Sequence, residues 1–309
     1  MIENLNNFLK KYNYKAGIIP FKRLKELEDD INGLYKNKYI NEAIYKLYLS
    51  NFSYNIEEGR YSFKPESVII IAVPRPQNRI CFNIENKRLP VIVPPAYIGQ
   101  RKINLKIKDI LDCYLGGTGY KVLHTRSQVP EKLIAAYSGL TWYGKNNISY
   151  IREFGSFFHL ASFFSNISCD YENWHGKKEL EDCLECRECM KNCPTGAITD
   201  KRFLIHAERC LTFFNEEPGD FPAWVNPQSH NCLVGCMKCQ IICPYNKPFI
   251  NYIEDIGEFT AEETEILLRS LPDEKLTPSI KDKIELLDLQ NFISVIPRNL
   301  KVLLKKENI

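Results

Sequence analysis

The chain has 309 residues, of which 44% are hydrophobic and 26% charged, and its formal net charge is +3 at pH 7. That length usually forms two domains, or one large domain with an appendage, and the composition provides enough apolar residues for a real core. The longest aliphatic run, Val68 to Val73, is too short to cross a bilayer, and residues 1–4 lack the basic and apolar regions of an export signal. These observations argue against membrane-spanning and exported proteins, so we expect a cytoplasmic protein.

The first 168 residues alternate between helical and strand patterns, which predicts an α/β layered domain with a mixed sheet. The clearest strand is the β-branched run 67–73, which ends at Pro74 and Pro76. In chain order the predicted elements are a helix at 5–12, a strand at 16–20, a helix at 40–49, the strand at 67–73, a helix at 103–114, a strand at 120–124, a helix at 133–138 and a strand at 157–164.

Two further segments follow. Residues 169–250 are rich in cysteine, and regular structure should be sparse there. Residues 251–309 have apolar residues at helical spacing and are acidic, with 8 Lys and Arg against 12 Asp and Glu. The chain as a whole is therefore predicted to be of the α+β class, with three consecutive segments at 1–168, 169–250 and 251–309.

Two runs of four cysteines indicate the chemistry of the middle segment. The first run reads Cys-x2-Cys-x2-Cys-x3-Cys-Pro, which is the spacing of bacterial ferredoxins that carry two [4Fe–4S] clusters. In such modules the last cysteine of each run ligates the cluster of the other run. The first cluster is thus expected on Cys183, Cys186, Cys189 and Cys243, and the second on Cys193, Cys210, Cys236 and Cys239.

Other interpretations of the cysteines fit less well. A tetrahedral zinc site has no use for a third cysteine in the same tight turn, and a disulfide framework suits short secreted chains. Cys210 is the least certain ligand because it lies outside a tight motif, and Cys232 competes with it. The prolines after Cys193 and Cys243 are each expected to start a short helix, over 195–198 in the first case.

One group of motifs resembles a known family. Glu131-Lys132 is followed by Gly139-Leu-Thr-Trp-Tyr-Gly-Lys-Asn146, then Gly155-Ser-Phe-Phe-His-Leu160, and then the two cysteine runs. In this order, over roughly residues 60–250, they resemble the epoxyqueuosine reductase family, of which the reductive dehalogenases are distant relatives. The resemblance implies a cobalamin-binding N-terminal domain, two [4Fe–4S] clusters that feed electrons to cobalt, and reduction of an epoxide on a modified nucleoside in tRNA, the last step of queuosine biosynthesis.

The same resemblance suggests residues that contact the corrinoid. Lys145 and Asn146 match the family element beside the corrin, where ammonium and amide groups could meet its amides or phosphate. The alternative is an ordinary turn, in which asparagine tolerates left-handed geometry. Trp142 and its neighbour Tyr143 could pack against the corrin or fill the core.

Two departures from the family affect the expected reaction. Its proton donor is an aspartate shortly before its Glu-Arg pair, but here that position is occupied by Thr125, or by His124 after a one-residue shift. Opening an epoxide requires a proton, which histidine can supply and threonine cannot. His124 could instead ligate cobalt or simply be a structural residue at the end of a strand. The family's C-terminal helical repeats are also missing, and an acidic tail is the wrong sign for gripping tRNA phosphates.

The sequence thus favours an iron–sulfur, cobalamin-dependent reductase that resembles epoxyqueuosine reductase, acts on epoxyqueuosine in tRNA or on another substrate, and receives electrons from a ferredoxin or flavodoxin. One alternative is a ferredoxin-like electron carrier without corrinoid. A second is a corrinoid-reactivating protein.

Overall fold

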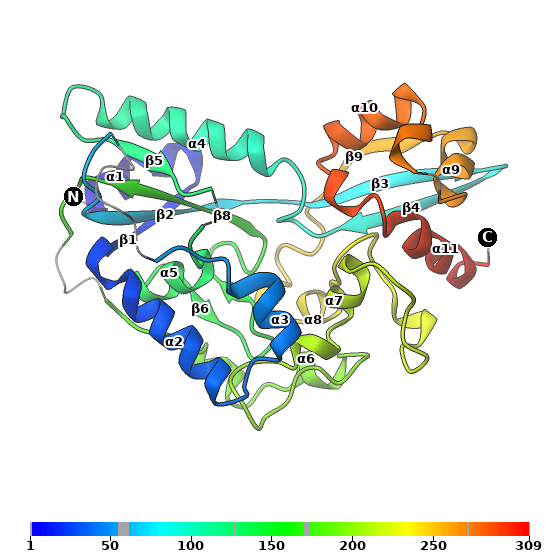
Figure 1. Ribbon diagram of the computed structural model, residues 1–309, viewed down its shortest axis with the longest axis horizontal. Helices are drawn as coiled ribbons and strands as arrows, with labels where there is room; N and C mark the ends of the chain where they lie inside the picture. Colours follow the sequence, from blue (N-terminus) through cyan, green and yellow to red (C-terminus); the bar gives the residue numbers. More distant parts are fainter. Residues whose placement is uncertain (1, 55–61, 127, 170–173, 271, 309) are drawn as a thin grey trace. The chain divides into compact units, whose positions relative to one another are not determined.

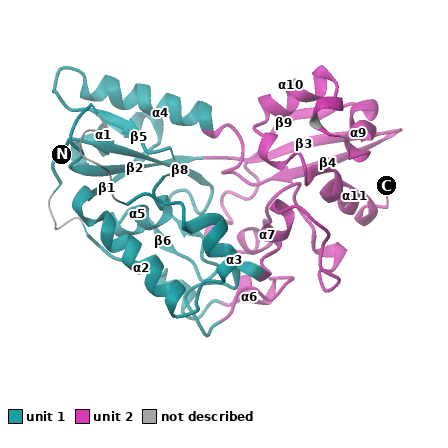
Figure 2. Ribbon diagram, in the orientation of Figure 1, with its two compact units in different colours: residues 1–74, 101–186, 200–208 teal, residues 75–100, 187–199, 209–309 magenta. Residues whose placement is uncertain are grey.

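The computed structural model describes residues 2–54, 62–126, 128–169, 174–270 and 272–308 (Figure 1). The chain divides into two compact units, and each is assembled from three separate segments (Figure 2). Unit 1 contains residues 1–74, 101–186 and 200–208, and unit 2 contains residues 75–100, 187–199 and 209–309. This division groups residues by packing. The division into three consecutive segments at 1–168, 169–250 and 251–309 stays a prediction.

Unit 1 is built on a four-stranded antiparallel sheet with the order β1-β2-β8-β5. Its strands are β1 (Lys15–Pro20), β2 (Ser67–Pro74), β5 (Val122–His124) and β8 (Phe158–Ser165). β2 is an inner strand, and it is buried along nearly its whole length. Its continuous run of β-branched residues is what a strand covered on both faces requires.

Helices cover both faces of this sheet (Figure 1). They are α1 (Ile2–Leu9) and α4 (Gln100–Leu115) on one face, and α2 (Leu24–Lys36) and α5 (Glu131–Tyr137) on the other. Successive side chains of a strand point to opposite faces. Ile69 and Ile71 therefore pack in the core under α1 and α4, while Val68 and Ile70 pack in the core with α2 and α5. Unit 1 is a layered α/β structure.

Short elements complete unit 1. The segment after α2 forms α3 (Glu42–Ile44), which continues as a π-helical turn over Tyr45–Leu49. Two short strands, β6 (Trp142–Tyr143) and β7 (Ser149–Tyr150), form a small antiparallel sheet. Short 3₁₀ turns lie at Lys10–Tyr12, Phe21–Arg23 and Glu181–Cys183.

Unit 2 contains a three-stranded sheet with the order β4-β3-β9. β3 (Gln77–Ile84) and β4 (Lys87–Val93) form an antiparallel hairpin, and β9 (Ile253–Phe259) pairs parallel to β3. Its helices are α6 (Glu188–Lys191), α7 (Leu211–Glu216), α8 (Lys238–Ile241), α9 (Ala261–Leu268), α10 (Pro278–Leu286) and α11 (Ile296–Lys306). Its 3₁₀ turns include Pro227–Ser229, Pro244–Asn246, Asp273–Lys275 and Gln290–Phe292. Another 3₁₀ turn, Ala207–Arg209, falls at a boundary between segments of the two units.

The fold class predicted from the sequence is confirmed, but five strands had been missed. Two of them, β6 and β7, are only two residues long, and the other three form the sheet of unit 2. β3 carries several polar residues, and β4 contains Pro90, which is tolerated because β4 is an edge strand. β9 is acidic, and it lies where only helices were expected. The mixed pairing expected in the N-terminal sheet occurs in this smaller sheet instead.

The short helix expected after Pro194 is wrong. Residues 194 and 195 form a turn, and Gly196 takes a left-handed conformation with a φ of 63°, which stops a right-handed helix from continuing. After Cys243 the expectation is confirmed, because Pro244–Asn246 forms a 3₁₀ turn with proline in its first turn. Across the described part of the chain, the helices are all too short or too polar to span a membrane.

Candidate functional site

Six of the eight predicted cluster ligands belong to unit 2. Cys189 lies in α6 and Cys239 lies in α8, and these two helices pack against each other. Cys193, Cys210 and Cys236 are close enough for their charges to influence one another. The fold therefore brings together parts of the two cysteine runs that are some forty residues apart in the sequence.

Several hydrogen bonds reach the sulfur atoms. The Asn231 side chain donates to Cys236 Sγ at 3.2 Å, and the Ala197 backbone N–H donates to Cys193 Sγ at 3.3 Å. Hydrogen bonds to ligand sulfurs tune the reduction potential of a cluster. Burial raises the pKa of the Cys210 thiol to about 11. Because iron takes up the thiolate, cluster assembly here must release the thiol proton.

Cys232, the competitor of Cys210, has a different environment. It is fully buried, and its thiol donates to Asn231 Oδ1 at 3.1 Å. Cys210 instead immediately precedes α7 and is partly exposed. Cys183 and Cys186 belong to unit 1, where Cys183 ends a 3₁₀ turn. Within the described residues, no three metal-ligating side chains are gathered tightly enough to share one metal ion. The assignment of individual cysteines to the two clusters stays a prediction.

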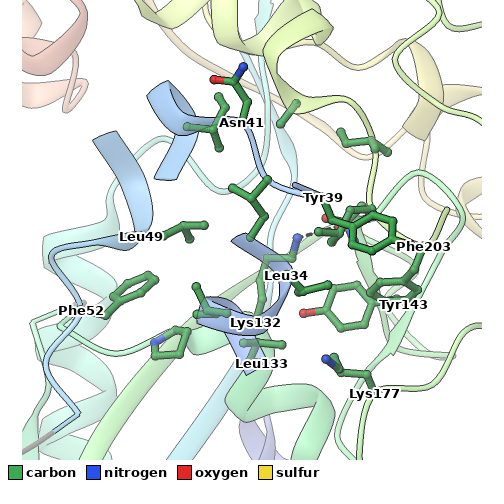
Figure 3. Close-up of a pocket in the computed structure, with 18 of the residues that line it drawn as sticks. Leu34, Tyr39, Asn41, Leu49, Phe52, Lys132, Leu133, Tyr143, Lys177 and Phe203 are labelled. Carbon is green, nitrogen blue, oxygen red and sulfur yellow. Dashed lines mark hydrogen bonds between the residues drawn. The ribbon is translucent and has the colours of Figure 1, made fainter. Parts of the chain in front are cut away.

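Unit 1 contains a cavity of about 420 Å³, which we call the Lys132 cavity (Figure 3). Its walls come from α2, from the segment 39–52, from the start of α5 and from residues 203–208. Figure 3 shows Tyr39, Tyr143 and Phe203 on one side, and Leu49 and Phe52 on the other. The size lies within the range of small-molecule sites, and so does the mixture of apolar walls with a few polar groups.

Lys132 provides a positive charge in this cavity. Its ammonium group donates to the Asn147 backbone oxygen at 2.6 Å and lies 5.3 Å from the centre of the Tyr143 ring. The side chain reaches solvent through the cavity, but the surrounding protein lowers the pKa of Lys132 to about 8. A second lysine at the wall, Lys177, is paired with Asp30 at 2.8 Å. The cavity thus favours a ligand with an apolar body and a negative or electron-rich group.

Glu131 is a partly buried acid beside this lysine. Its Oε1 accepts two hydrogen bonds from Ser162 of β8, from the backbone N–H at 3.1 Å and from the hydroxyl at 2.8 Å. Burial raises the pKa of Glu131 to about 7, although both hydrogen bonds from Ser162 oppose that rise. Near neutral pH the carboxyl group is therefore poised between its protonated and ionised forms.

The two residues at the position of the family's proton donor do not line the cavity. Thr125 is buried, and its hydroxyl lies 2.6 Å from the Ser162 hydroxyl. His124 accepts a hydrogen bond from the Arg126 backbone N–H at Nδ1, at 3.1 Å, and its ring packs edge-on against Phe163. Its Nε2 is buried and has no hydrogen-bond partner among the described residues. Burial and then Arg126 lower the pKa of His124, so the neutral ring is favoured near pH 7.

The three residues predicted to meet the corrinoid lie on the β6–β7 hairpin and outside the Lys132 cavity. Asn146 is buried, where it donates to Tyr150 Oη at 2.9 Å and accepts from the Ile148 N–H at 3.2 Å. Lys145 lies 3.5 Å from an Asp200 oxygen. The contacts of Asn146 are those of a tight turn. A Cβ at Gly144 would lie 2.7 Å from Asn146 Oδ1, which explains the glycine.

Trp142 precedes Tyr143 in β6, so their side chains point to opposite faces. Tyr143 is buried at the Lys132 cavity, whereas Trp142 is 39% exposed and lines a second cavity of about 540 Å³. The structure thus separates two aromatic residues that the sequence placed together. Contact of these three residues with a corrinoid stays a prediction.

Sequence reasoning missed most of the Lys132 cavity. Glu131 and Lys132 had served only to align the chain with a family, and Lys177 and Phe203 had no role assigned. The usable signal was the pair Glu131-Lys132 itself, since charged residues that begin an otherwise apolar helix next to a buried strand are candidates for a site. The walls from residues 39–52 and 203–208 carry no motif.

Comparison with known proteins gives the sequence relationships of the chain. Residues 182–246 match the family described as the 4Fe-4S double cluster binding domain. The chain is 26% identical over 263 residues to an epoxyqueuosine reductase of Francisella cf. novicida, an alignment that covers 79% of this chain and 71% of that protein. It is 30% identical over 148 residues to the epoxyqueuosine reductase of Pseudomonas aeruginosa, covering 48% of this chain and 40% of that protein.

Solved structures give the fold. The structure of epoxyqueuosine reductase from Bacillus subtilis matches with a TM-score of 0.67 at 19% identity, over 99% of this chain and 82% of that one. The enzyme from Streptococcus thermophilus matches with a TM-score of 0.64 at 18% identity, over 100% of this chain and 81% of that one. The chain is therefore similar in sequence to epoxyqueuosine reductases and has the fold of their solved structures, and residues 182–246 match a 4Fe-4S double cluster binding domain.

Proposed function

We propose that this protein is an iron–sulfur, corrinoid-dependent reductase that passes electrons through two [4Fe–4S] clusters to a corrinoid and reduces an epoxide-type substrate. The observation that carries the proposal is the combination, in one chain, of a double-cluster domain with an epoxyqueuosine reductase fold that holds a ligand-sized cavity. A ferredoxin-like carrier has no need of such a cavity.

The cysteine set fits two cubane clusters. Seven of the eight cysteines stand in two close runs of ferredoxin type, and the partly buried sulfurs of Cys193 and Cys236 accept hydrogen bonds from N–H donors. The Lys132 cavity fits a corrinoid only in part. At about 420 Å³ it lies near the small end of the range for drug-sized ligands, and a whole corrinoid is larger than such a ligand. The cavity is sized for a nucleoside or for one portion of a corrinoid.

The protein's own residues supply binding and protons. Tyr39, Phe52 and Phe203 provide apolar walls against which a ring of the ligand can pack. Lys132 would hold a negative or electron-rich group of the ligand, and Glu131 holds a proton near neutral pH. A bound corrinoid would supply the low-potential metal centre at which electrons from the clusters reach the substrate.

The substrate proposed first is epoxyqueuosine in tRNA. One neighbour, with a TM-score of 0.66 at 18% identity, is a crystal structure of epoxyqueuosine reductase with an epoxyqueuosine-modified tRNA stem loop. The acidic C-terminal segment weakens this choice, because it would repel a phosphate backbone. The electron donor is proposed to be a reduced ferredoxin or flavodoxin. The cytoplasm is the proposed compartment, because it is reducing enough to keep cluster cysteines free of disulfides.

The proposal is tested by anaerobic reconstitution with iron and sulfide, followed by addition of cobalamin and gel filtration. We expect about eight iron atoms per chain, and corrin absorbance that elutes with the protein. Clusters without corrin absorbance would favour the electron carrier instead. If the bound corrin is reduced but an epoxyqueuosine-containing stem loop is not turned over, the protein is a corrinoid-dependent reductase that acts on another substrate. Restoration of queuosine in a strain that lacks the reductase would establish the tRNA role.

A further inference from the structure

We propose that Glu131 is the acid of the Lys132 cavity and gives a proton to the oxygen that leaves the substrate. This inference rests on the proposed reductase function and goes beyond it by assigning the catalytic acid. The assignment begins from position. Glu131 opens α5, lines the cavity directly beside Lys132, and has one carboxyl oxygen fixed from behind by β8.

The hydrogen bonds behind Glu131 form a directed chain. A carboxylate can only accept, so the Ser162 hydroxyl must donate to Glu131 when that residue is ionised. The Thr125 hydroxyl, 2.6 Å away, then donates to Ser162. Glu131 Oε1 is held in this way, and among the described residues neither Thr125 nor Ser162 offers a bond to Oε2. Oε2 is the oxygen that remains for a ligand.

The charges around the carboxyl group suit an acid that works near neutral pH. Besides Glu131, the titratable groups that line the cavity are Lys132 beside it on α5, Tyr143 on β6, Tyr39, Lys177 and Glu208. His124 on β5 is kept neutral by burial, which lowers its pKa. Burial dominates the behaviour of Glu131, and it raises the pKa of that carboxyl to about 7. General acids are most effective when their pKa lies near the working pH.

His124 is the weaker candidate for this role. Its Nδ1 already accepts the Arg126 N–H, its ring is held neutral near pH 7, and it does not line the cavity. Thr125 contributes differently, because its hydroxyl supports Ser162 and so reaches Glu131 indirectly. Thr125 and Ser162 are therefore positioning residues. The proton that the family's aspartate supplies comes here from Glu131, the first residue of α5.

The chemical step balances as follows. When a C–O bond of the epoxide breaks, the electron pair stays on oxygen, the Glu131 proton forms the new O–H bond, and a carboxylate remains. Removal of the oxygen as water, with formation of a C=C bond, consumes two electrons and two protons. The electrons come from the ferredoxin- or flavodoxin-type donor, and solvent supplies the second proton and reprotonates Glu131.

The test is the variant Glu131→Gln in the reconstituted protein with both clusters and cobalamin. Glutamine keeps the shape and the acceptor for Ser162 but cannot give the proton. We expect kcat on the epoxyqueuosine stem loop to fall by about 10²–10⁴-fold, with KM changed little. The wild-type rate should fall as the pH rises through about 7, where Glu131 loses its proton. In Ser162→Ala the hydrogen bond from the serine hydroxyl to Glu131 is lost. That bond favours the ionised form of Glu131, so its loss should raise the pKa of Glu131 and move the alkaline fall in rate to higher pH.

A second readout does not depend on turnover. Infrared difference spectra between pH 6 and pH 8 should show a carboxyl band that disappears with a midpoint near pH 7 and is missing from Glu131→Gln. Glu153→Gln is the matched control, since Glu153 is an exposed carboxylate paired with Lys15 at 2.5 Å. Its rate and pH profile should equal those of the wild type.

The outcomes separate the two proposals. If Glu131→Gln turns over within threefold of the wild type, or if the alkaline limb stays in place in Ser162→Ala, Glu131 is not the acid while the reductase function stands. If the wild-type protein binds clusters and corrinoid but opens no epoxide, the proposed function fails and the acid role fails with it.

Discussion

His230 is a buried base that the fold requires to be neutral. It is 1% exposed, its ring packs edge-on against Phe221, and its Nδ1 has no partner among the described residues. Burial, followed by the charges of Arg298 and Lys306, lowers the pKa of His230 to about 4. The unfolded chain takes up this proton near pH 6.5. Stability contributed by neutral His230 is thus complete above about pH 6.5 and is lost as the pH falls towards 4.

This difference predicts a measurable pH dependence of stability. Between pH 7.5 and pH 6.0, His230 should remove about 1 kcal/mol from the free energy of unfolding. In His230→Gln that part of the pH dependence should disappear. Chemical denaturation of the cluster-loaded protein at both pH values measures it. Equal pH dependence in wild type and variant would show that His230 titrates normally in the folded protein.

Substitutions of Cys210 and Cys232 are expected to have different effects on the iron content of the second predicted cluster. Cys210 lies near Cys193 and Cys236, whereas the Cys232 thiol is hydrogen-bonded within the core. Cys210→Ala should reduce the iron content from about eight atoms per chain to about four, because one cubane loses a ligand. Cys232→Ala should keep about eight. Iron and sulfide analysis with electron paramagnetic resonance of the reduced protein checks both, and the reverse pattern would make Cys232 the ligand.

At the scale of elements, α11 is hydrogen-bonded to the segments that follow and precede two predicted cluster ligands, Cys210 and Cys236. The Asn299 side chain donates to the backbone oxygens of Asn215 and Leu233, at 2.8 Å each. Asn215 lies in α7, which begins directly after Cys210. The Asn215 side chain donates to the backbone oxygen of Gly235 at 2.7 Å, and Gly235 directly precedes Cys236. Arg298 donates to the carbonyls of Glu217 and Phe214. The helix thus links the segment that follows Cys210 to the segment that precedes Cys236.

Asn299→Ala should therefore affect both stability and iron content. It leaves two buried carbonyl oxygens without donors, which should lower the free energy of unfolding by about 2 kcal/mol or more. The occupancy of the second cluster should fall in parallel, as measured by iron per chain. Lys301→Ala, at an exposed position of the same helix, is the control and should stay within about 0.5 kcal/mol of the wild type. Full iron content in Asn299→Ala would show that α11 does not position the ligands.

The elements with strong periodicity could be predicted from the sequence, and those set by tertiary packing could not. The strand at 67–73 and the helix at 103–114 follow from runs of apolar residues with clear periods. β9 could not be predicted, because its exposed acidic residues hide the few that pack, such as Phe259 against Phe82. In the candidate site, the cysteine spacing was readable, whereas the Lys132 cavity depends on segments that only the fold brings together.

At the scale of the whole molecule, the C-terminal segment is part of a core. Phe259, Ile280, Ile296 and Leu300 share one buried cluster with residues of the β3–β4 hairpin. A chain ended after Ile250 loses that half of the core together with β9. We expect it to be insoluble or to bind less than two iron atoms per chain after reconstitution. A chain ended after Lys306, which keeps all of α11, should behave as the full chain does. Normal iron content in the shorter chain would show that the cluster segment folds by itself.

The parallel pairing of β9 with β3 also sets the order of events during synthesis. Arg79 and Asp255, which form an ion pair at 2.5 Å across these strands, are 176 positions apart in the chain. At about 5–20 residues per second, a ribosome needs roughly ten to thirty-five seconds to make that stretch. For that time one edge of β3 is open to other strands, which makes the nascent chain a client for chaperones. The eight predicted cluster cysteines precede α11 in the chain, so the hydrogen bonds from Asn299 to Asn215 and Leu233 can form only after all eight have been synthesised.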